Sequence, residues 1–241
     1  MAVRTESLRY EADGLSMVGY LAWDASVTEP RPGVLVFPEA FGLGDHAKGR
    51  AERLAEEFGY VALACDLHGD GKVLDKLDEV MALLSPLRTE ASKVRDRTGK
   101  ALAALAARSE VNPARIAAIG FCFGGTMAYE LALSGADIRA AIGFHSGLQV
   151  TSPHDSKAIK GKVMALLGAD DPGIPPEQRA AFEQMLRDGQ VDWQMHLYGG
   201  VVHSFTNPAA DALSNPALRY DPTADARSWE QMALLLSEVF A

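Results

Sequence analysis

The chain has 241 residues, of which 48% are hydrophobic, enough to bury the core of an α/β domain without disulfides or a metal. Its net charge of −9 argues against nucleic acid as a partner, because phosphate binding relies on basic surfaces. It contains no run of the roughly 18 apolar residues that a membrane-spanning helix needs, so we expect no membrane partner either.

Cysteine content and the start of the chain bear on its compartment. Only Cys65 and Cys122 are present, and residues 1–6 lack the apolar core of a signal peptide. We therefore expect a cytoplasmic protein. As to oligomeric state, we expect a monomer or homodimer. The chain shows no long linker or internal repeat, so we expect one domain over residues 1–241, with a hairpin and linker in residues 1–30.

The first third of the chain predicts a hairpin and then a buried strand. Residues 6–24 alternate loosely around the turn pair Asp13-Gly14, which is typical of an antiparallel hairpin. The continuous apolar run at 33–37 predicts a buried strand, and Glu39 follows its end. Because ligands bind at this edge of an open α/β sheet, Glu39 is a candidate site residue; the alternative is a solvated loop carboxylate.

Residues 47–110 predict helices around one further strand. Helical spacing over 47–58 closes at Gly59, and the strand at 60–65 makes Cys65 a packing residue. The polar loop 66–71 lacks the ligand spacing of a metal site, so we expect no metal. Residues 72–110 predict two helical segments around Ser85-Pro86, the second over 91–107.

The sequence Gly-Phe-Cys-Phe-Gly-Gly at 120–125 stands between an apolar run and a helix-forming segment. A nucleophile elbow needs small residues at such a turn, because its central residue is strained and the strand and helix pass close together. Cys122 is then the nucleophile, with the helix N-terminus favouring the thiolate and an oxyanion. The alternative is an inert, buried thiol in an ordinary glycine-rich turn.

Three further strands are each predicted to end in ionisable residues. They cover 138–144, 162–167 and 191–198, and they precede His145, the pair Asp170-Asp171, and the loop that carries His203. Helices are predicted at 177–187 and 223–240.

Nucleophilic catalysis needs a nucleophile, a base and a group that orients the base. Cys122, Asp171 and His203 follow one another in the order nucleophile, acid, histidine, and each follows a predicted strand. This order predicts a catalytic triad. His145 is the alternative base and Asp170 the alternative acid.

Taken together, four motifs resemble the dienelactone hydrolase family over residues 30–240: Pro-Glu-Ala-Phe-Gly at 38–42, the elbow at 120–125, Asp171 with Pro175, and His-Ser-Phe at 203–205. The resemblance implies an α/β-hydrolase fold, a three-layer sandwich with a mostly parallel sheet of about eight strands. It also implies an enzyme that opens small esters or lactones through a Cys-His-Asp triad and a thioacyl-enzyme, with no metal or organic cofactor.

The same resemblance assigns roles to individual residues. It selects Asp171 over Asp170 as the acid, and it makes Glu39 the group that contacts the cysteine at rest and takes its proton when substrate binds. Backbone N–H groups of Phe123 and Ala40 are implied as the oxyanion hole.

The chain also departs from the family in its substrate-binding residues. Asn207 stands where the family carries an arginine that pairs with the carboxylate of dienelactone, and a neutral amide cannot replace a guanidinium in that role. Arg88 is a candidate for the second arginine, and His145 for the pocket wall. A small ester or lactone other than dienelactone is therefore a substrate at least as fitting.

Two other functions stay open on sequence grounds. One is a non-catalytic ligand-binding protein of the same fold, since folds do not fix functions. The other is a thioesterase or peptidase acting on larger acyl groups, which would need a wider cleft than a chain without an obvious cap domain predicts.

Overall fold

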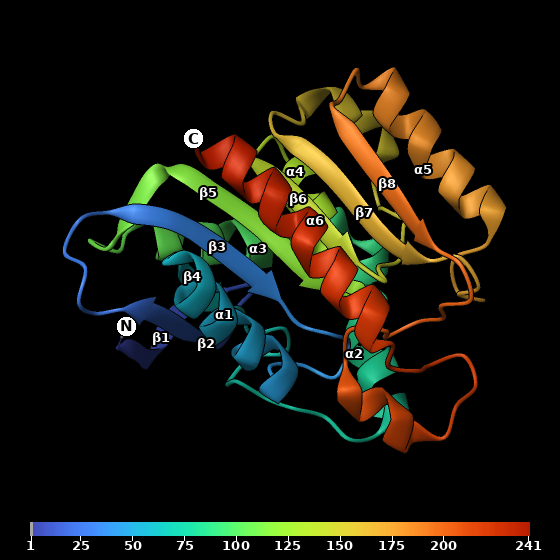
Figure 1. The fold of residues 1–241 in the computed structure, drawn as a ribbon, viewed down its shortest axis with the longest axis horizontal. Helices are drawn as coiled ribbons and strands as arrows, with labels where there is room; N and C mark the ends of the chain where they lie inside the picture. The colour runs from blue at the N-terminus through green and yellow to red at the C-terminus, as the bar shows by residue number, and fades with distance from the viewer. Residues whose placement is uncertain (1) are drawn as a thin grey trace.

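The computed structural model describes residues 2–241, in which one eight-stranded sheet lies between two layers of helices (Figure 1). The strand order is β1-β2-β4-β3-β5-β6-β7-β8. Strands β1, β2 and β4 pair antiparallel, and every pair from β4 to β8 is parallel. This is the three-layer α/β-hydrolase sandwich that the sequence predicts.

The strands and helices alternate along most of the chain. The strands are β1 (Val3–Ala12), β2 (Leu15–Asp24), β3 (Arg31–Phe37), β4 (Val61–Ala64), β5 (Val111–Phe121), β6 (Ala140–Phe144), β7 (Lys162–Gly168) and β8 (Trp193–Tyr198). The helices are α1 (Asp45–Phe58), α2 (Leu77–Thr89), α3 (Ala91–Ala106), α4 (Phe123–Leu133), α5 (Pro176–Asp188) and α6 (Pro222–Phe240), with short 3₁₀ helices η1 (Pro153–Ala158) and η2 (Pro208–Leu213).

The N-terminal hairpin forms at the predicted turn. Asp13 and Gly14 have φ of 52° and 70°, the left-handed conformation that a two-residue hairpin turn requires. The hairpin of β1 and β2 joins the parallel strands because β2 pairs with β4, so it extends the sheet at one edge.

Alternating side chains of each central strand divide the core into two layers. In β3, Val34 and Val36 pack with α1 and α6 on one face, whereas Leu35 and Phe37 pack with the helices of the other face. Both faces are covered, so the strand needs an unbroken apolar run rather than a polar alternation. Within residues 2–241, no helix combines the length and the apolar character needed to cross a bilayer.

The segment before β5 differs from the expectation that two helices meet at Ser85-Pro86. Pro86 lies inside α2, and the chain breaks at Glu90, which is extended with φ −116° and ψ 94°. A proline deprives a helix of one hydrogen bond, but here Val80, Leu84 and Leu87 are buried along one face on both sides of it. Burial of this face therefore holds the last turn in place.

The first turn of α4 passes so close to its neighbours that only glycine fits. A Cβ on Gly124 would lie 2.3 Å from the carbonyl oxygen of Phe37, and one on Gly125 would lie 2.2 Å from the Ser146 Cβ. A Cβ on Gly120 would meet the carbonyl oxygen of Gly124 at 2.1 Å. Backbone and packed core atoms cannot give way cheaply, so the turn depends on all three glycines.

We expect Gly124→Ala to lower the free energy of unfolding by about 1–3 kcal/mol, because the added methyl group displaces the backbone of β3. Gly99→Ala is the control, since a Cβ on this α3 residue meets nothing within 4 Å. Alanine should stabilise that helix by about 0.5–1 kcal/mol. Urea unfolding followed by circular dichroism measures both, and equal effects would contradict the close approach.

Candidate active site

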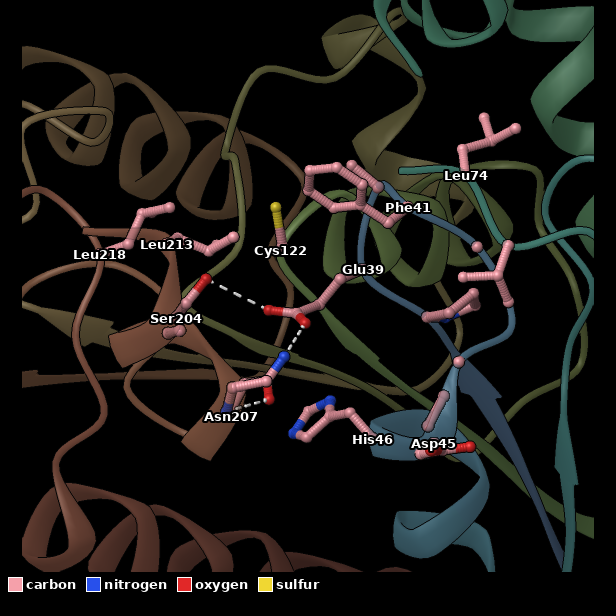
Figure 2. Close-up of a pocket in the computed structure, with 18 of the residues that line it drawn as sticks. Glu39, Phe41, Asp45, His46, Leu74, Cys122, Ser204, Asn207, Leu213 and Leu218 are labelled. Atoms are coloured by element: carbon pink, nitrogen blue, oxygen red, sulfur yellow. Dashed lines mark hydrogen bonds between the residues drawn. The ribbon is translucent and has the colours of Figure 1, made fainter. Parts of the chain in front are cut away.

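A cavity of about 520 Å³ opens at the carboxyl edge of the parallel strands. Glu39, which follows β3, Cys122, which follows β5, and His203, which follows β8, all line it (Figure 2). The sequence predicted that these strand ends converge, and the sheet topology brings them together because β3, β5, β6, β7 and β8 all run in the same direction.

Cys122 occupies the sharp turn between β5 and α4. Its backbone has φ 54° and ψ −121°, a strained conformation for any residue with a side chain. The turn is fixed because the Cys122 N–H donates to the Phe144 carbonyl at 3.0 Å and the Gly125 N–H donates to the Cys122 carbonyl at 3.1 Å. The thiol stands at the N-terminus of α4, where the helix dipole favours a thiolate.

His203 and Asp171 form a close pair beside this thiol. Nδ1 of His203 lies 2.6 Å from Oδ2 of Asp171, whose side chain is buried just after β7. Gly173 donates its N–H to the other carboxylate oxygen at 2.8 Å. Asp170 is exposed instead, and its backbone N–H donates to the Val201 carbonyl. Asp171 is thus the aspartate that reaches the histidine.

The charges around His203 favour its protonated form. Burial lowers the pKa of His203, but the negative charges of Cys122 and Asp171 and their hydrogen bonds outweigh burial and raise the pKa well above its usual value. The imidazolium can therefore stand between a thiolate and a carboxylate. That arrangement suits a group that must give a proton to a leaving group and later take one from water.

Glu39 lies in the cavity but binds groups other than the thiol. Its carboxylate accepts hydrogen bonds from Oγ of Ser204 at 3.2 Å and from Nδ2 of Asn207 (Figure 2). No hydrogen bond joins Glu39 to Cys122 in the part of the chain that the structure describes. Withdrawal from bulk water raises the pKa of Glu39, and the two hydrogen bonds only partly oppose this shift.

The two residues whose N–H groups are predicted to form an oxyanion hole lie near Cys122, Phe123 as the next residue in the chain and Ala40 in the lining of the same cavity. As the first residue of α4, Phe123 has an N–H with no acceptor inside the helix. Ala40 belongs to the loop after β3, and Nε2 of His68 donates to its carbonyl oxygen at 2.8 Å. Burial lowers the pKa of His68, so a neutral imidazole holds this loop. No local sequence pattern signals this contact, because Ala40 and His68 are 28 residues apart.

Two of the predicted substrate-binding residues do not line the cavity. His145 is fully buried behind His203, with ring centroids 5.1 Å apart, and its Nε2 lies 2.8 Å from Oγ1 of Thr206. Arg88 is exposed, with its guanidinium 5.6 Å from the ring centroid of Phe123. Asn207 does line the cavity, but its amide is engaged by Glu39. Neither His145 nor Asn207 thus presents a free polar group to a ligand in this conformation.

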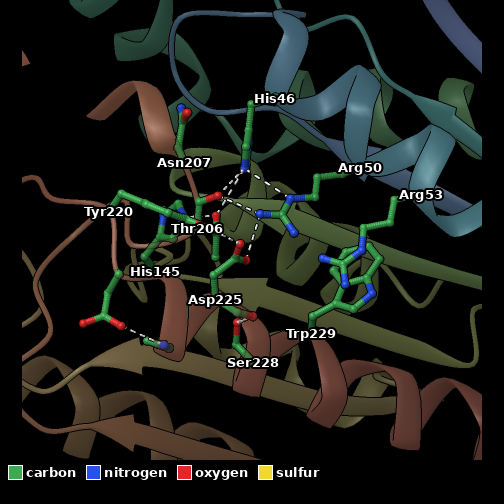
Figure 3. Close-up of polar contacts among 12 residues, drawn as sticks. His46, Arg50, Arg53, His145, Thr206, Asn207, Tyr220, Asp225, Ser228 and Trp229 are labelled. Carbon is green, nitrogen blue, oxygen red and sulfur yellow. Dashed lines mark hydrogen bonds and ion pairs between the residues drawn. The ribbon is translucent and has the colours of Figure 1, made fainter. Parts of the chain in front are cut away.

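A buried polar network holds the loop that carries His203 (Figure 3). Arg50 of α1 donates to the Thr206 carbonyl at 2.6 Å and pairs with Asp225 of α6 at 2.8 Å. His46 and His145 contact Thr206 from either side, at 3.1 Å to its carbonyl oxygen and 2.8 Å to its hydroxyl. Nothing in the local sequence signals this network, because its members come from four separate segments.

The fold and the strained cysteine at the strand-to-helix turn define an α/β-hydrolase-fold protein. The model of the dienelactone hydrolase family matches residues 17–240, and the chain belongs to this hydrolase family. Among residues 2–241, no group of three or more His, Cys, Asp or Glu side chains is arranged to hold a metal ion.

Individual relatives agree with this assignment. The chain is similar to the solved structure "m3DLH", at 45% identity and a TM-score of 0.97, with all of both chains covered. It is similar to a dienelactone hydrolase-like promiscuous phosphotriesterase from metagenomic libraries, at 42% identity and a TM-score of 0.95, again over all of both chains. A Bradyrhizobium relative, named "Probable 2-oxo-3-(5-oxofuran-2-ylidene)propanoate lactonase", is 28% identical over 93% of this chain and 90% of its own.

We expect His203 to keep its proton to well above the usual pKa of histidine, about 6.5, and Asp171→Asn to lower that pKa by removing one of the charges that raise it. Titration of the six histidines by nitrogen-15 NMR measures both. Stability linked to this proton is fully present below about pH 6.5 and is lost as pH rises through the raised pKa. Asp170→Asn is the control, and an equal shift in both variants would contradict the pairing.

Proposed function

We propose that the protein hydrolyses small esters or lactones through a thioacyl-enzyme formed on Cys122. One observation carries the proposal: the strained thiol shares its cavity with His203, whose other ring nitrogen is held by the buried Asp171. This is the relation between nucleophile, base and orienting acid that nucleophilic catalysis requires. The family assignment supports the same class of reaction.

The proposed acylation begins with attack of the Cys122 thiolate on the ester carbonyl carbon. The carbonyl oxygen becomes an oxyanion, which the N–H groups of Phe123 and Ala40 stabilise by hydrogen bonding. The carbon–oxygen bond then breaks, and the leaving alkoxide takes the proton of the His203 imidazolium. The products of this step are an alcohol, or the freed hydroxyl of an opened lactone, and a thioester on Cys122.

Deacylation returns the enzyme to its starting state. Neutral His203 takes a proton from water as the oxygen attacks the thioester carbonyl, and collapse of the second oxyanion expels the thiolate and yields the carboxylic acid. Asp171 orients the imidazole and stabilises its charge in both steps. We assign Glu39 to accept the Cys122 proton when substrate binds and to return it to the thiolate after the product leaves. The raised pKa of Glu39 supports this role because it brings the carboxyl closer to the proton affinity of a thiol.

We expect Cys122→Ala to lower hydrolysis of p-nitrophenyl acetate at least about a thousandfold, because the nucleophile is lost. Glu39→Gln should lower turnover about a hundredfold while leaving the fold intact, since a proton acceptor is lost. The release of p-nitrophenolate measures both. Cys65→Ala is the control, because this second thiol is fully buried and burial raises its pKa. Unchanged turnover in Glu39→Gln would remove that residue from the mechanism.

Phosphotriester hydrolysis is a second candidate activity. The relative that is 42% identical is described as a promiscuous phosphotriesterase. A phosphotriester carries no charge and needs no cation to bind it, and no lysine or arginine among residues 2–241 lines the cavity. We expect paraoxon to be hydrolysed more slowly than p-nitrophenyl acetate, with the activity lost in Cys122→Ala. Paraoxon hydrolysis that survives in Cys122→Ala would place that activity outside this site.

A further inference from the structure

The charge of the cavity is one-sided. Three carboxylates line it, from Glu39, Asp45 and Asp75, and no lysine or arginine of residues 2–241 does so. The remaining ionisable groups are Cys122, His203 and His46. His203 has a raised pKa and pairs with Asp171, whereas burial lowers the pKa of His46 to about 3, which keeps it uncharged. Asp45 and Asp75 are both exposed to solvent.

The cations that neighbour this lining in sequence face other groups. Lys48, which follows Ala47, lies 5.9 Å from the ring centroid of Tyr20, and Arg219, which follows Leu218, donates to the Gly200 carbonyl at 3.1 Å. Lys72 pairs with Asp70 at 3.1 Å, and Lys76 pairs with Glu79 at 3.1 Å, so the two lysines around Asp75 face other carboxylates. Arg50 pairs with Asp225 behind the loop of His203. A substrate carboxylate in the cavity would therefore meet like charges. The only cation of the lining within residues 2–241 is the His203 imidazolium, which already faces Cys122 and Asp171, so binding of the carboxylate costs free energy.

The amide of Asn207 does not offset this deficit. It stands where the family resemblance places a carboxylate-binding arginine, and it donates to Glu39. That hydrogen bond and the one from Ser204 both go to the Glu39 carboxylate, so this amide donor is already engaged by a group of the protein.

Apolar side chains cover the rest of the cavity on two sides. Figure 2 shows Phe41 and Leu74 on one side of Cys122 and Leu213 and Leu218 on the other. Val73 and Leu213 stand at the mouth with 58% and 54% of their surface exposed. Exposed apolar surface of this kind at a concave site gains free energy when an apolar ligand covers it.

We propose that this site selects uncharged esters with an apolar chain or ring and rejects esters that carry a carboxylate, with Asp45 and Asp75 as the residues that enforce the rejection. The apolar group lies between the loop that carries Val73 and Leu74 and the η2 segment. This selectivity rests on the ester hydrolysis proposed above and names its substrate class.

The test compares two acyl chains of equal length that differ in a terminal charge, p-nitrophenyl hexanoate and mono-p-nitrophenyl adipate. We expect the wild type to prefer the hexanoate at least about tenfold in kcat/KM at low salt, because like charges repel the adipate. The preference should shrink at roughly 0.5 M salt, where exposed charges are screened.

The variant Asp45→Asn/Asp75→Asn should reduce the hexanoate-to-adipate ratio at least about threefold by removing two like charges from the mouth. Its matched control is Asp78→Asn/Asp137→Asn, which removes two exposed carboxylates outside the cavity and should leave the ratio unchanged.

Equal or faster turnover of the adipate by the wild type overturns the selectivity, as does a ratio that both double variants change equally. If the esters are cleaved and Cys122→Ala abolishes the cleavage, such a result leaves the thiol hydrolase intact and removes only the substrate class. Absence of cleavage for both esters, or cleavage that survives in Cys122→Ala, overturns the proposed hydrolysis itself and the selectivity with it.

Discussion

The close backbone approach at the start of α4 is the constraint on which the site depends. Gly124 lies against the backbone of β3, Gly125 lies against Ser146 beyond β6, and Gly120 lies against the helix itself. Only this spacing lets the chain turn from β5 into α4 with Cys122 at φ 54°. The strain is therefore held by packing on both sides, and the thiol is presented at the sheet edge with a helix N-terminus behind it.

His203, which shares the cavity with this thiol, is held in place by contacts from two helices. In the loop that carries His203, Thr206 is anchored by Arg50 of α1, which in turn pairs with Asp225 of α6. A buried ion pair gains little net stability because both charges are desolvated, but its geometry is specific. The two helices on one face of the sheet thus fix the position of the His203 imidazole at the sheet edge (Figure 3). The desolvated ion pair itself lies behind the loop and outside the cavity.

The cavity wall and the three side chains proposed to catalyse hydrolysis come from different parts of the fold, so one scaffold can serve different substrates. Cys122, His203 and Asp171 depend on the sheet and its glycine turn, whereas the cavity wall comes from the loop before α2 and from η2. Asn207 belongs to this wall and stands where the family resemblance implies an arginine. Its amide donates a hydrogen bond to Glu39. Family membership therefore constrains the reaction more closely than it constrains the substrate.

The sequence by itself determined the layered fold and predicted that three candidate residues follow its strand ends. Continuous apolar runs predict buried parallel strands, and parallel strands deliver their following residues to one edge, so Cys122, Asp171 and His203 could be grouped before any contact was known. The hairpin turn and the glycine elbow also depend on neighbouring residues alone. The predicted helix break near Pro86 was wrong, because burial of Leu87 outweighed the proline.

Only the tertiary structure decided which polar atoms meet around that framework. His68 reaches the Ala40 carbonyl across 28 residues, Asn207 reaches Glu39 across 168, and His145 turns toward Thr206 behind the cavity instead of lining it. Ser204 follows His203 in a motif of the sequence, but its hydrogen bond to Glu39 is visible only in the structure. These pairings depend on the directions of side chains on segments that are distant in the chain, and no local pattern of hydrophobicity or turn residues carries that information.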